Sequence, residues 1–202
     1  MTNKAEPPAP VHIYMRDEGR FLATREAGRR AAGSFRRVAG MQGDIILDFN
    51  GVEAATPPFL QELWNEVGSL ILATHGAGRI VLAANLNEDL AETLTYVAAR
   101  AKRGIPYVHG RKLDLLGAER PDLVRTLQEA QRLKPFFTAP ELAEKLEIQP
   151  DTATQRLKRL LERGAAERQP DPEAERGVRH LYRVPDPKLA QASASPAKTA
   201  LA

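Results

Sequence analysis

The side chains best suited to chemistry lie between residues 150 and 164, where polar and cationic groups recur at helical spacing. At about 100° per residue, those that face away from the apolar side of this helix or flank that face are Thr152, Gln155, Arg156, Lys158 and Arg159. Cationic groups neutralise phosphates, and the affinity that they give falls with salt because counterions are released. Gln155 and Arg159 also have donors that can hydrogen-bond to base edges in a groove. The stretch therefore predicts contact with double-stranded DNA.

A second basic segment follows between residues 176 and 183. It contains Arg176, Arg179 and Arg183 and no carboxylate. Runs of charge often only solvate an exposed face, and for an isolated helix that interpretation is preferred. Arg176 and Arg179 are nevertheless predicted to contact DNA, because the helices and strands predicted around them place both basic segments in one domain.

The elements around the first basic segment have clear start and stop signals. Thr138 and Glu141 form a capping box, which predicts a short helix from Thr138. Its pattern ends at residues 147–149, and Pro150 suits the first turn of a second helix. The buried face of that second helix is predicted to consist of Ala153, Leu157, Leu160 and Leu161. Gly164 ends it in a left-handed conformation.

A β-hairpin is predicted directly after the second helix. Residues 165–169 and 178–184 have strand character, and residues 170–177 form the turn between them. Helix, tight turn, second helix and hairpin in this order resemble the winged helix-turn-helix of bacterial transcription regulators, in which the second helix enters the major groove. The resemblance covers about 50 residues and a preceding helix over 121–133. It implies a homodimer that binds paired half-sites on DNA.

Composition narrows the classes of protein that remain. The chain has 202 residues and a net charge of +3, so DNA binding must come from a local patch. Cysteine is absent, which excludes disulfides and thiolate sites and is compatible with a reducing cytoplasm. No apolar stretch is long enough to span a membrane. The four histidines lack ligand spacing, so no metal site and no cofactor are predicted.

The N-terminal half alternates strands and helices. Strands are predicted over 11–15, 44–49 and 79–83, and helices over 22–38, 57–71 and 87–103. This alternation predicts an α/β layer with at least partly parallel strands. Residues 104–117 contain a further short strand, 105–108, and are expected to join the two domains.

Specific predictions follow for three residues in the predicted helices of this half. Trp64 lies on the apolar side of its predicted helix and is expected in the core. Gly28 and Gly33 are expected to weaken the first helix by about 1 kcal/mol each relative to alanine.

Residues 45–67, IILDFNGVEAATPPFLQELWNEV, share several features with one known family. An apolar strand ends in Asp-Phe, and a Gly-Val turn, a small or hydroxylic run, a Phe and a Glu-Leu pair follow. The segment is similar to the central strand-turn-helix of the STAS-like family, small bacterial domains related to anti-sigma-factor antagonists. In that family a histidine-kinase-type ATPase can phosphorylate a hydroxyl at the head of the helix. The resemblance places this switch at Thr56, although a plain N-cap is the simpler expectation.

Asp48 and Asn50 invite comparison with phosphohydrolases of the haloacid-dehalogenase type. In those enzymes an Asp at a strand end attacks phosphate, and a second Asp two residues later acts as the acid. Here the second position is Asn50, and the later lysine and acidic-pair motifs are not apparent. We therefore predict no catalytic residue and no enzymatic activity, and we expect Asp48 to be a turn or surface carboxylate.

Together these features predict an α/β protein with two domains. A STAS-like α/β layer is expected over 11–117 and a winged helix-turn-helix over 118–187, between a disordered lead, 1–10, and a disordered tail, 188–202. The predicted function is a cytoplasmic, sequence-specific DNA-binding transcription regulator of bacterial type, whose STAS-like domain mediates assembly or senses a partner or signal. The alternative is a signalling adaptor that binds a kinase or an anti-sigma-like protein and uses the winged helix for protein contact. The operator sequence and the direction of regulation are left open.

Overall fold

Five strands form the sheet of the N-terminal part. The structure, a computed structural model, describes residues 9–38, 43–73, 80–101, 104–110, 112–117, 120–133, 135–174 and 179–188. The strands are β1 (Val11–Tyr14), β3 (Ile45–Asp48), β5 (Val81–Ala84), β6 (Ile105–His109) and β7 (Lys112–Leu116). They lie in the order β1-β3-β5-β6-β7, and all neighbours pair in parallel except β6 and β7. The predicted α/β layer is therefore confirmed.

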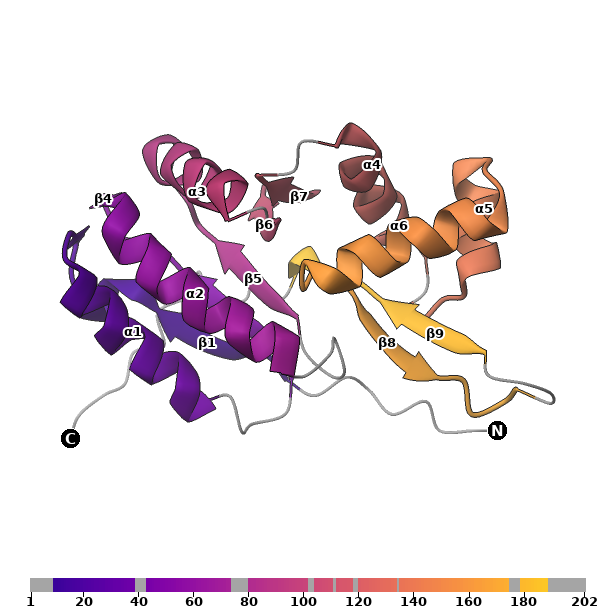
Figure 1. Ribbon diagram of the computed structural model, residues 1–202, viewed down its shortest axis with the longest axis horizontal. Coiled ribbons are helices and arrows are strands. Elements are labelled where there is room, and N and C mark those ends of the chain that lie inside the picture. The colour runs from indigo at the N-terminus through magenta and orange to yellow at the C-terminus, as the bar shows by residue number, and fades with distance from the viewer. Residues whose placement is uncertain are drawn as a thin grey trace.

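Three helices cover one face of this sheet. They are α1 (Arg25–Val38), α2 (Pro57–Ala73) and α3 (Glu88–Arg100), and each connects successive parallel strands. Such crossovers are right-handed, and the parallel strands follow one another across the sheet in one direction, so all three helices belong on the same face. Figure 1 shows α1 and α2 side by side in front of the strands. The opposite face must be covered by another part of the chain.

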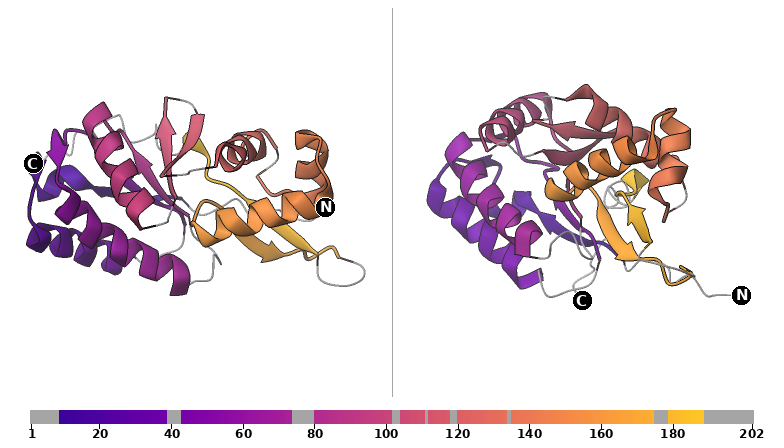
Figure 2. Two further views of the ribbon diagram at one scale, coloured as in Figure 1. Left: turned by 45° about the horizontal axis from the view of Figure 1, so that its top comes forward. Right: turned by 45° about the vertical axis from the view of Figure 1, so that its right-hand side comes forward.

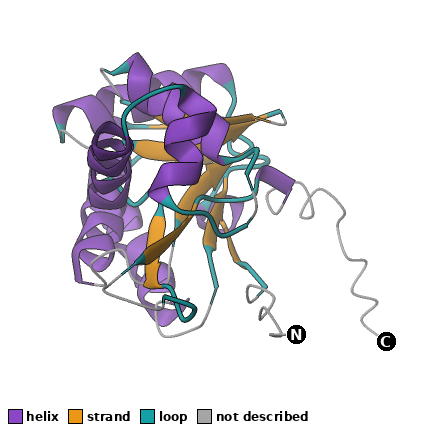
Figure 3. Cartoon of the chain, turned by 90° about the vertical axis from the view of Figure 1, so that its right-hand side faces the viewer, coloured by secondary structure: helices purple, strands orange, loops and turns teal. Residues whose placement is uncertain are grey.

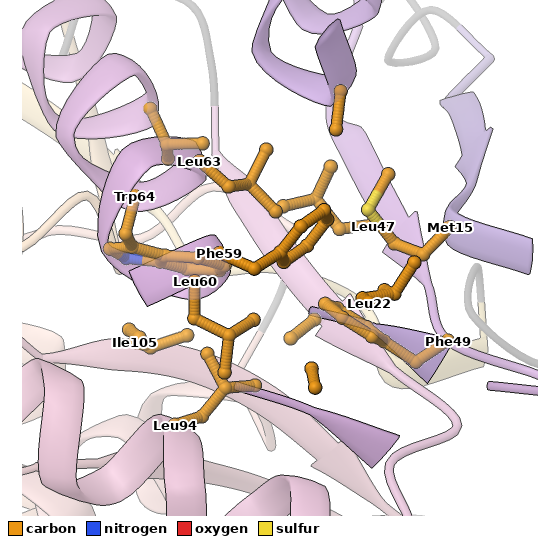
Figure 4. Close-up of a cluster of buried hydrophobic side chains, with 14 of the residues drawn as sticks. Met15, Leu22, Leu47, Phe49, Phe59, Leu60, Leu63, Trp64, Leu94 and Ile105 are labelled. Carbon is orange, nitrogen blue, oxygen red and sulfur yellow. The ribbon is translucent and has the colours of Figure 1, made fainter. Parts of the chain in front are cut away.

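The helix-covered face encloses an apolar core. The sheet contributes Ile45, Leu47, Val81 and Ala83 among other side chains. Figure 4 shows how Phe59, Leu60 and Leu63 of α2 meet Leu47 of β3 and Leu94 of α3. Trp64 belongs to the same cluster and is 5% exposed, which confirms its prediction as a core residue.

Helix α1 lies very close to α2 at one glycine. A Cβ atom on Gly28 would lie 2.6 Å from the backbone oxygen of Phe59, whereas one on Gly33 would meet nothing within 4 Å. Gly28 therefore permits the two backbones to approach, a role that propensity alone does not indicate. The helix begins later than predicted because β2 (Phe21–Leu22) pairs in parallel with β4 (Ala54–Ala55). A short 3-10 helix, η1 (Met15–Glu18), precedes β2.

The region expected to join the domains is part of the sheet. Residues 105–109 and 112–116 form the hairpin β6–β7, in which Ile105 pairs with Leu116 and His109 with Lys112. Gly110 lies in its turn with a φ of +61°. The predicted strand over 105–108 is confirmed as β6, whereas β7 was not predicted, and its side chains Leu113 and Leu115 complete the second face of the sheet.

The C-terminal part is a winged helix-turn-helix. Its elements are α4 (Pro121–Ala130), α5 (Ala139–Leu146), α6 (Pro150–Glu162), β8 (Glu167–Pro170) and β9 (His180–Arg183). The capping box is present, since the Thr138 amide donates to Glu141 and the Glu141 amide donates to the Thr138 hydroxyl. Phe137 pairs with Tyr182 and adds a third backbone segment to the β8–β9 hairpin. The predicted order of helices and hairpin is confirmed.

The winged helix covers the second face of the sheet. Ile46, Leu82, Ala84, Leu113 and Leu115 point to this face and share one apolar cluster with the winged helix. Members from the winged helix include Leu127, Leu157, Leu160, Tyr182 and Val184. Figures 1 and 2 show α5, α6 and the hairpin at the opposite end of the molecule from α1 and α2. Figure 3 looks onto that end and shows helices in front of and beside the strands.

Several expectations fall on residues that the structure does not describe. Most of the predicted lead, 1–8, nearly all of the tail, 189–202, and Arg79 at the start of one predicted strand lie outside the described residues. Among the described residues, no helix has the length and apolar character needed to cross a membrane.

Candidate nucleic-acid interface

Helix α6 is held by its apolar side and presents its polar side outward. Ala153, Leu157 and Leu160 are each 0% exposed. The turn before α6 is made by Glu147, whose φ of +58° lies in the left-handed region, and Gly164 after it has a φ of +68°. Leu161 is only partly buried. The predicted buried face is therefore confirmed for three of its four residues.

The predicted contact residues of α6 differ in exposure. Gln155 and Lys158 are exposed, whereas Thr152 and Arg159 are half-buried. Thr154 is exposed beside Gln155, and its hydroxyl donates a 3.0 Å hydrogen bond to the Pro150 carbonyl. Our sequence-based selection omitted Thr154, although helical spacing places it on the same exposed side. The free surface is therefore centred on Thr154, Gln155 and Lys158.

Acidic side chains interrupt the positive charge of this surface. Asp151 in the first turn and Glu162 in the last turn of α6 are exposed. Lys158 lies between them, with the half-buried Arg159 and Arg163 beside it. A duplex would therefore meet positive charge in the middle of α6 rather than along its whole length.

Arg156 makes contacts within the winged helix. Its Nε lies 3.5 Å from Oδ2 of Asp122 in α4, and its Nη1 lies 3.5 Å from the hydroxyl of Thr126. Arg120 shares the same carboxylate, with its Nη2 2.8 Å from Asp122 Oδ2. The Arg156 side chain is 19% exposed. The structure thus places Arg156 against α4, apart from Gln155 and Lys158.

In the described part of the wing, one of the predicted cations has an acidic partner. Arg179 is exposed, but its guanidinium pairs with the carboxylate of Asp171. Arg176 lies outside the described residues. Arg168 on β8 is exposed, although it was not among the predicted contact residues.

Arg183 was counted as part of a basic surface, and this interpretation was wrong. Its side chain is 9% exposed and pairs with Asp44, before β3, and with Glu167 at the start of β8. Burial opposes the charge, but hydrogen bonds and charges from Asp44 and Glu167 outweigh it and raise the pKa of Arg183. Arg183 is a buried internal cation, because a partner 139 residues away in sequence completes its site.

Thr56 lies directly before α2, as predicted. It is half-buried, and its hydroxyl donates a 2.5 Å hydrogen bond to the carbonyl of Ala23. Phosphorylation would remove the proton that makes this bond. The local geometry therefore gives no support to a switch at this position beyond the resemblance itself.

Asp48 was expected in a turn or at the surface, and the structure corrects this to a buried site. It is 1% exposed, and its Oδ1 accepts from the Asn50 amide and the Asn85 side chain, both at 2.8 Å. Asn85 has a φ of +58°. Burial lowers the pKa of His12, and the Asp48 charge partly opposes that shift. These contacts give Asp48 the role of fixing the carboxyl ends of β3 and β5.

A cleft lies next to this position, at the carboxyl ends of β5 and β6. It has a volume of about 620 Å³ and is lined by Asn85, Asn87, Tyr107 and His109 among others. Burial, and then the charge of Asp114, raise the pKa of Tyr107. Asn87 is occupied as the N-cap of α3, where its side chain accepts from the Leu90 amide at 2.8 Å. No cluster that could hold a metal ion occurs among the described residues.

Comparison with known proteins bears on the C-terminal part. Residues 123–177 match the model of the MarR family, a stretch that begins within α4 and includes α5, α6 and β8. The C-terminal part is a winged helix-turn-helix of the transcription-regulator type. No significant match was found among curated proteins or among solved structures. The STAS-like resemblance of residues 45–67 therefore remains a prediction.

Proposed function

We propose that this chain is a sequence-specific DNA-binding transcription regulator that acts as a homodimer in the cytoplasm and has no enzymatic activity. The observation that carries the proposal is the joint exposure of Gln155 and Lys158 on α6. They lie inside the stretch that matches the MarR family, on the helix that follows the tight turn. That helix is the one that enters the major groove in this type of domain.

The exposed residues suit different parts of a duplex. The Gln155 amide has a donor and an acceptor, which together match the major-groove edge of adenine. Lys158 carries a compact ammonium on a flexible stem, which suits a phosphate. Arg168 supplies a cation on the wing side of α6. We therefore assign base recognition to Gln155 and backbone contact to Lys158.

The N-terminal α/β layer is proposed to assemble the homodimer or to sense a partner or signal. Winged helices of this type read paired half-sites, so a dimer would give an operator with two-fold symmetry. Light scattering with an absolute mass readout tests this part. A monomer at all concentrations, with or without DNA, would contradict it.

The experiment for DNA binding starts with selection from a randomised duplex library by the full chain. Binding to the selected duplex is then measured between about 50 and 200 mM salt. Lys158→Ala is expected to lower affinity on every sequence and to reduce the salt slope by about one, since one phosphate contact is lost. Gln155→Ala is expected to relax preference at one base position while the salt slope is unchanged.

A matched control is Arg100→Ala at the end of α3, an exposed cation in the α/β layer. It is expected to leave both affinity and slope unchanged. Failure of the library to yield any enriched sequence, with no binding at low salt, would contradict the proposed function and favour the adaptor alternative.

A further inference from the structure

A buried ionic cluster joins the wing to the sheet. Arg183 Nη1 lies 2.6 Å from Asp44 Oδ2, and Nη2 lies 2.7 Å from Asp44 Oδ1. Its Nε donates a 2.8 Å hydrogen bond to Oε2 of Glu167. The side chains of Arg183, Asp44 and Glu167 are 9%, 5% and 11% exposed. Two parallel bonds to one carboxylate fix both the position and the plane of the guanidinium.

Stability alone is a poor explanation for this cluster. Three charges have been taken out of water, and apolar replacements of such clusters are often as stable or more so. The surrounding interface is apolar, with Leu82 and Ile46 of the sheet against Tyr182 and Val184. Apolar contacts are not directional, so they alone would allow several similar dockings of the winged helix. The two parallel hydrogen bonds of the Arg183 guanidinium allow only one orientation of the winged helix.

The two ends of the cluster lie at structural junctions. The Asp44 carbonyl accepts from the Val11 amide at 2.8 Å, and its Oδ1 accepts from the Ile80 amide at 3.2 Å. The strands β1, β3 and β5 therefore begin around one residue. On the other side, Glu167 is the first residue of β8 and Arg183 the last of β9, and the two pair directly. The cluster thus joins the amino ends of three strands to the base of the wing.

Backbone hydrogen bonds connect the wing and α6 to that base. The ladder runs from the pair Glu167–Arg183 to the pair Pro170–His180, and the Asp171 amide continues it to the Arg179 carbonyl. The turn between α6 and β8 is closed by a 2.9 Å hydrogen bond from the Ala165 amide to the Leu160 carbonyl. A rotation at Arg183 would therefore displace both the wing and the exposed side of α6.

We infer that Asp44, through Arg183 and Glu167, is the positioning residue by which the α/β layer sets the orientation of the DNA-reading winged helix. The geometry of the ionic cluster by itself supports the inferred control of orientation. Its consequence for DNA binding rests on the proposed function.

The orientation is tested by distance measurement between spin labels. The chain has no cysteine, so Thr95→Cys on α3 and Lys145→Cys on α5, both exposed, give one defined label pair. The labelled protein in which Asp44, Glu167 and Arg183 are unchanged is expected to give a narrow distance distribution. The neutral triple variant Asp44→Asn, Glu167→Gln, Arg183→Met retains an acceptor for the Ile80 amide and leaves no unpaired charge. It is expected to stay folded and to give a broad or shifted distribution.

Arg183→Lys is the second variant, because an ammonium keeps the charge but cannot make the fork. It is expected to broaden the distribution to a smaller extent, and it decides the question if the triple variant does not fold. A broad distribution with the intact cluster, or a narrow and unshifted one in the folded variants, would overturn the inference.

DNA affinity provides the second readout, measured without labels on the duplex selected by the wild-type chain. The triple variant is expected to bind about tenfold more weakly with the same salt slope, because the contacts survive but their geometry is no longer preset. Absence of DNA binding by the wild-type chain would contradict the proposed function. The inference about orientation would then be tested by the distance measurement alone. Wild-type affinity in a folded triple variant with a broad distance distribution would overturn the link to DNA reading.

Discussion

The two faces of the central sheet are packed in different ways. On one face, α1, α2 and α3 form a core of apolar side chains, and their ion pairs lie at the surface, as in Arg25–Glu62 with an arginine 56% exposed. On the other face the winged helix adds a buried ion cluster, Asp44–Arg183–Glu167, to an apolar core. The crossover helices are confined by the strands on either side of them in sequence, so apolar packing suffices to place them. The winged helix has no such constraint, and directional contacts set its orientation.

The largest expected effect comes from removing the central cation of the winged-helix face. Arg183→Met leaves two carboxylates buried without their partner, and we expect a loss of about 3–5 kcal/mol in the free energy of unfolding. Urea denaturation followed by circular dichroism measures it. Arg20→Met is the matched control, because Arg20 and its partner Glu53 are both exposed, at 69% and 40%, and their pair is expected to contribute less than about 1 kcal/mol. Equal losses in the two variants would contradict the assigned difference between buried and exposed arginines.

The helix-covered face is tested by two glycines of one helix. Gly28→Ala places a Cβ 2.6 Å from the Phe59 oxygen, and we expect a destabilisation of about 1–3 kcal/mol from the forced separation of α1 and α2. Gly33→Ala meets nothing within 4 Å and is expected to stabilise by up to about 1 kcal/mol through helix propensity. Thermal unfolding of the two variants checks the opposite signs. If Gly28→Ala were as stable as Gly33→Ala, the close approach of the helices would not be needed.

The smallest expected effect concerns the partly buried pair Arg156–Asp122 between α6 and α4. Under the proposed function Asp122 competes with DNA for Arg156, so Asp122→Asn is expected to raise DNA affinity by a few-fold, within about 1 kcal/mol. The gain must disappear in an Arg156→Gln background if it comes from the released guanidinium. A double-mutant cycle on the selected duplex provides this comparison. The same gain in both backgrounds would mean that Asp122 acts by general repulsion, and that Arg156 stays outside the interface.

Local signals predicted most of the winged helix. The capping box at Thr138, Pro150 at a helix start and Gly164 at its end mark the boundaries of α5 and α6 without reference to distant residues. The strands β3 and β5 were equally visible as short apolar runs, and Asn87 marked the start of α3.

Two of the errors depend on partners far apart in sequence. The burial of Arg183 requires Asp44, and that of Asp48 is accompanied by the hydrogen bond from Asn85. The pairing of Arg156 with Asp122 of α4 was likewise not visible in helical spacing, and its contact with DNA stays a prediction. The missed strand β7 is a local error, because the alternation of Lys112 and Asp114 with leucines is itself a strand signal that our prediction did not use. Periodicity shows which side of an element is polar but not which polar group has an internal partner.

The proposed function places the exposed side of α6 in a DNA groove. Affinity cleavage tests it directly, since the chain has no cysteine and Thr154→Cys gives a single attachment point for an iron chelate on that side. With the selected duplex, cleavage is predicted within the bound half-sites, whereas the same chelate at Thr95→Cys on α3 should give none. Absent cleavage from position 154 in a complex that still forms, or cleavage from position 95 alone, would contradict the account.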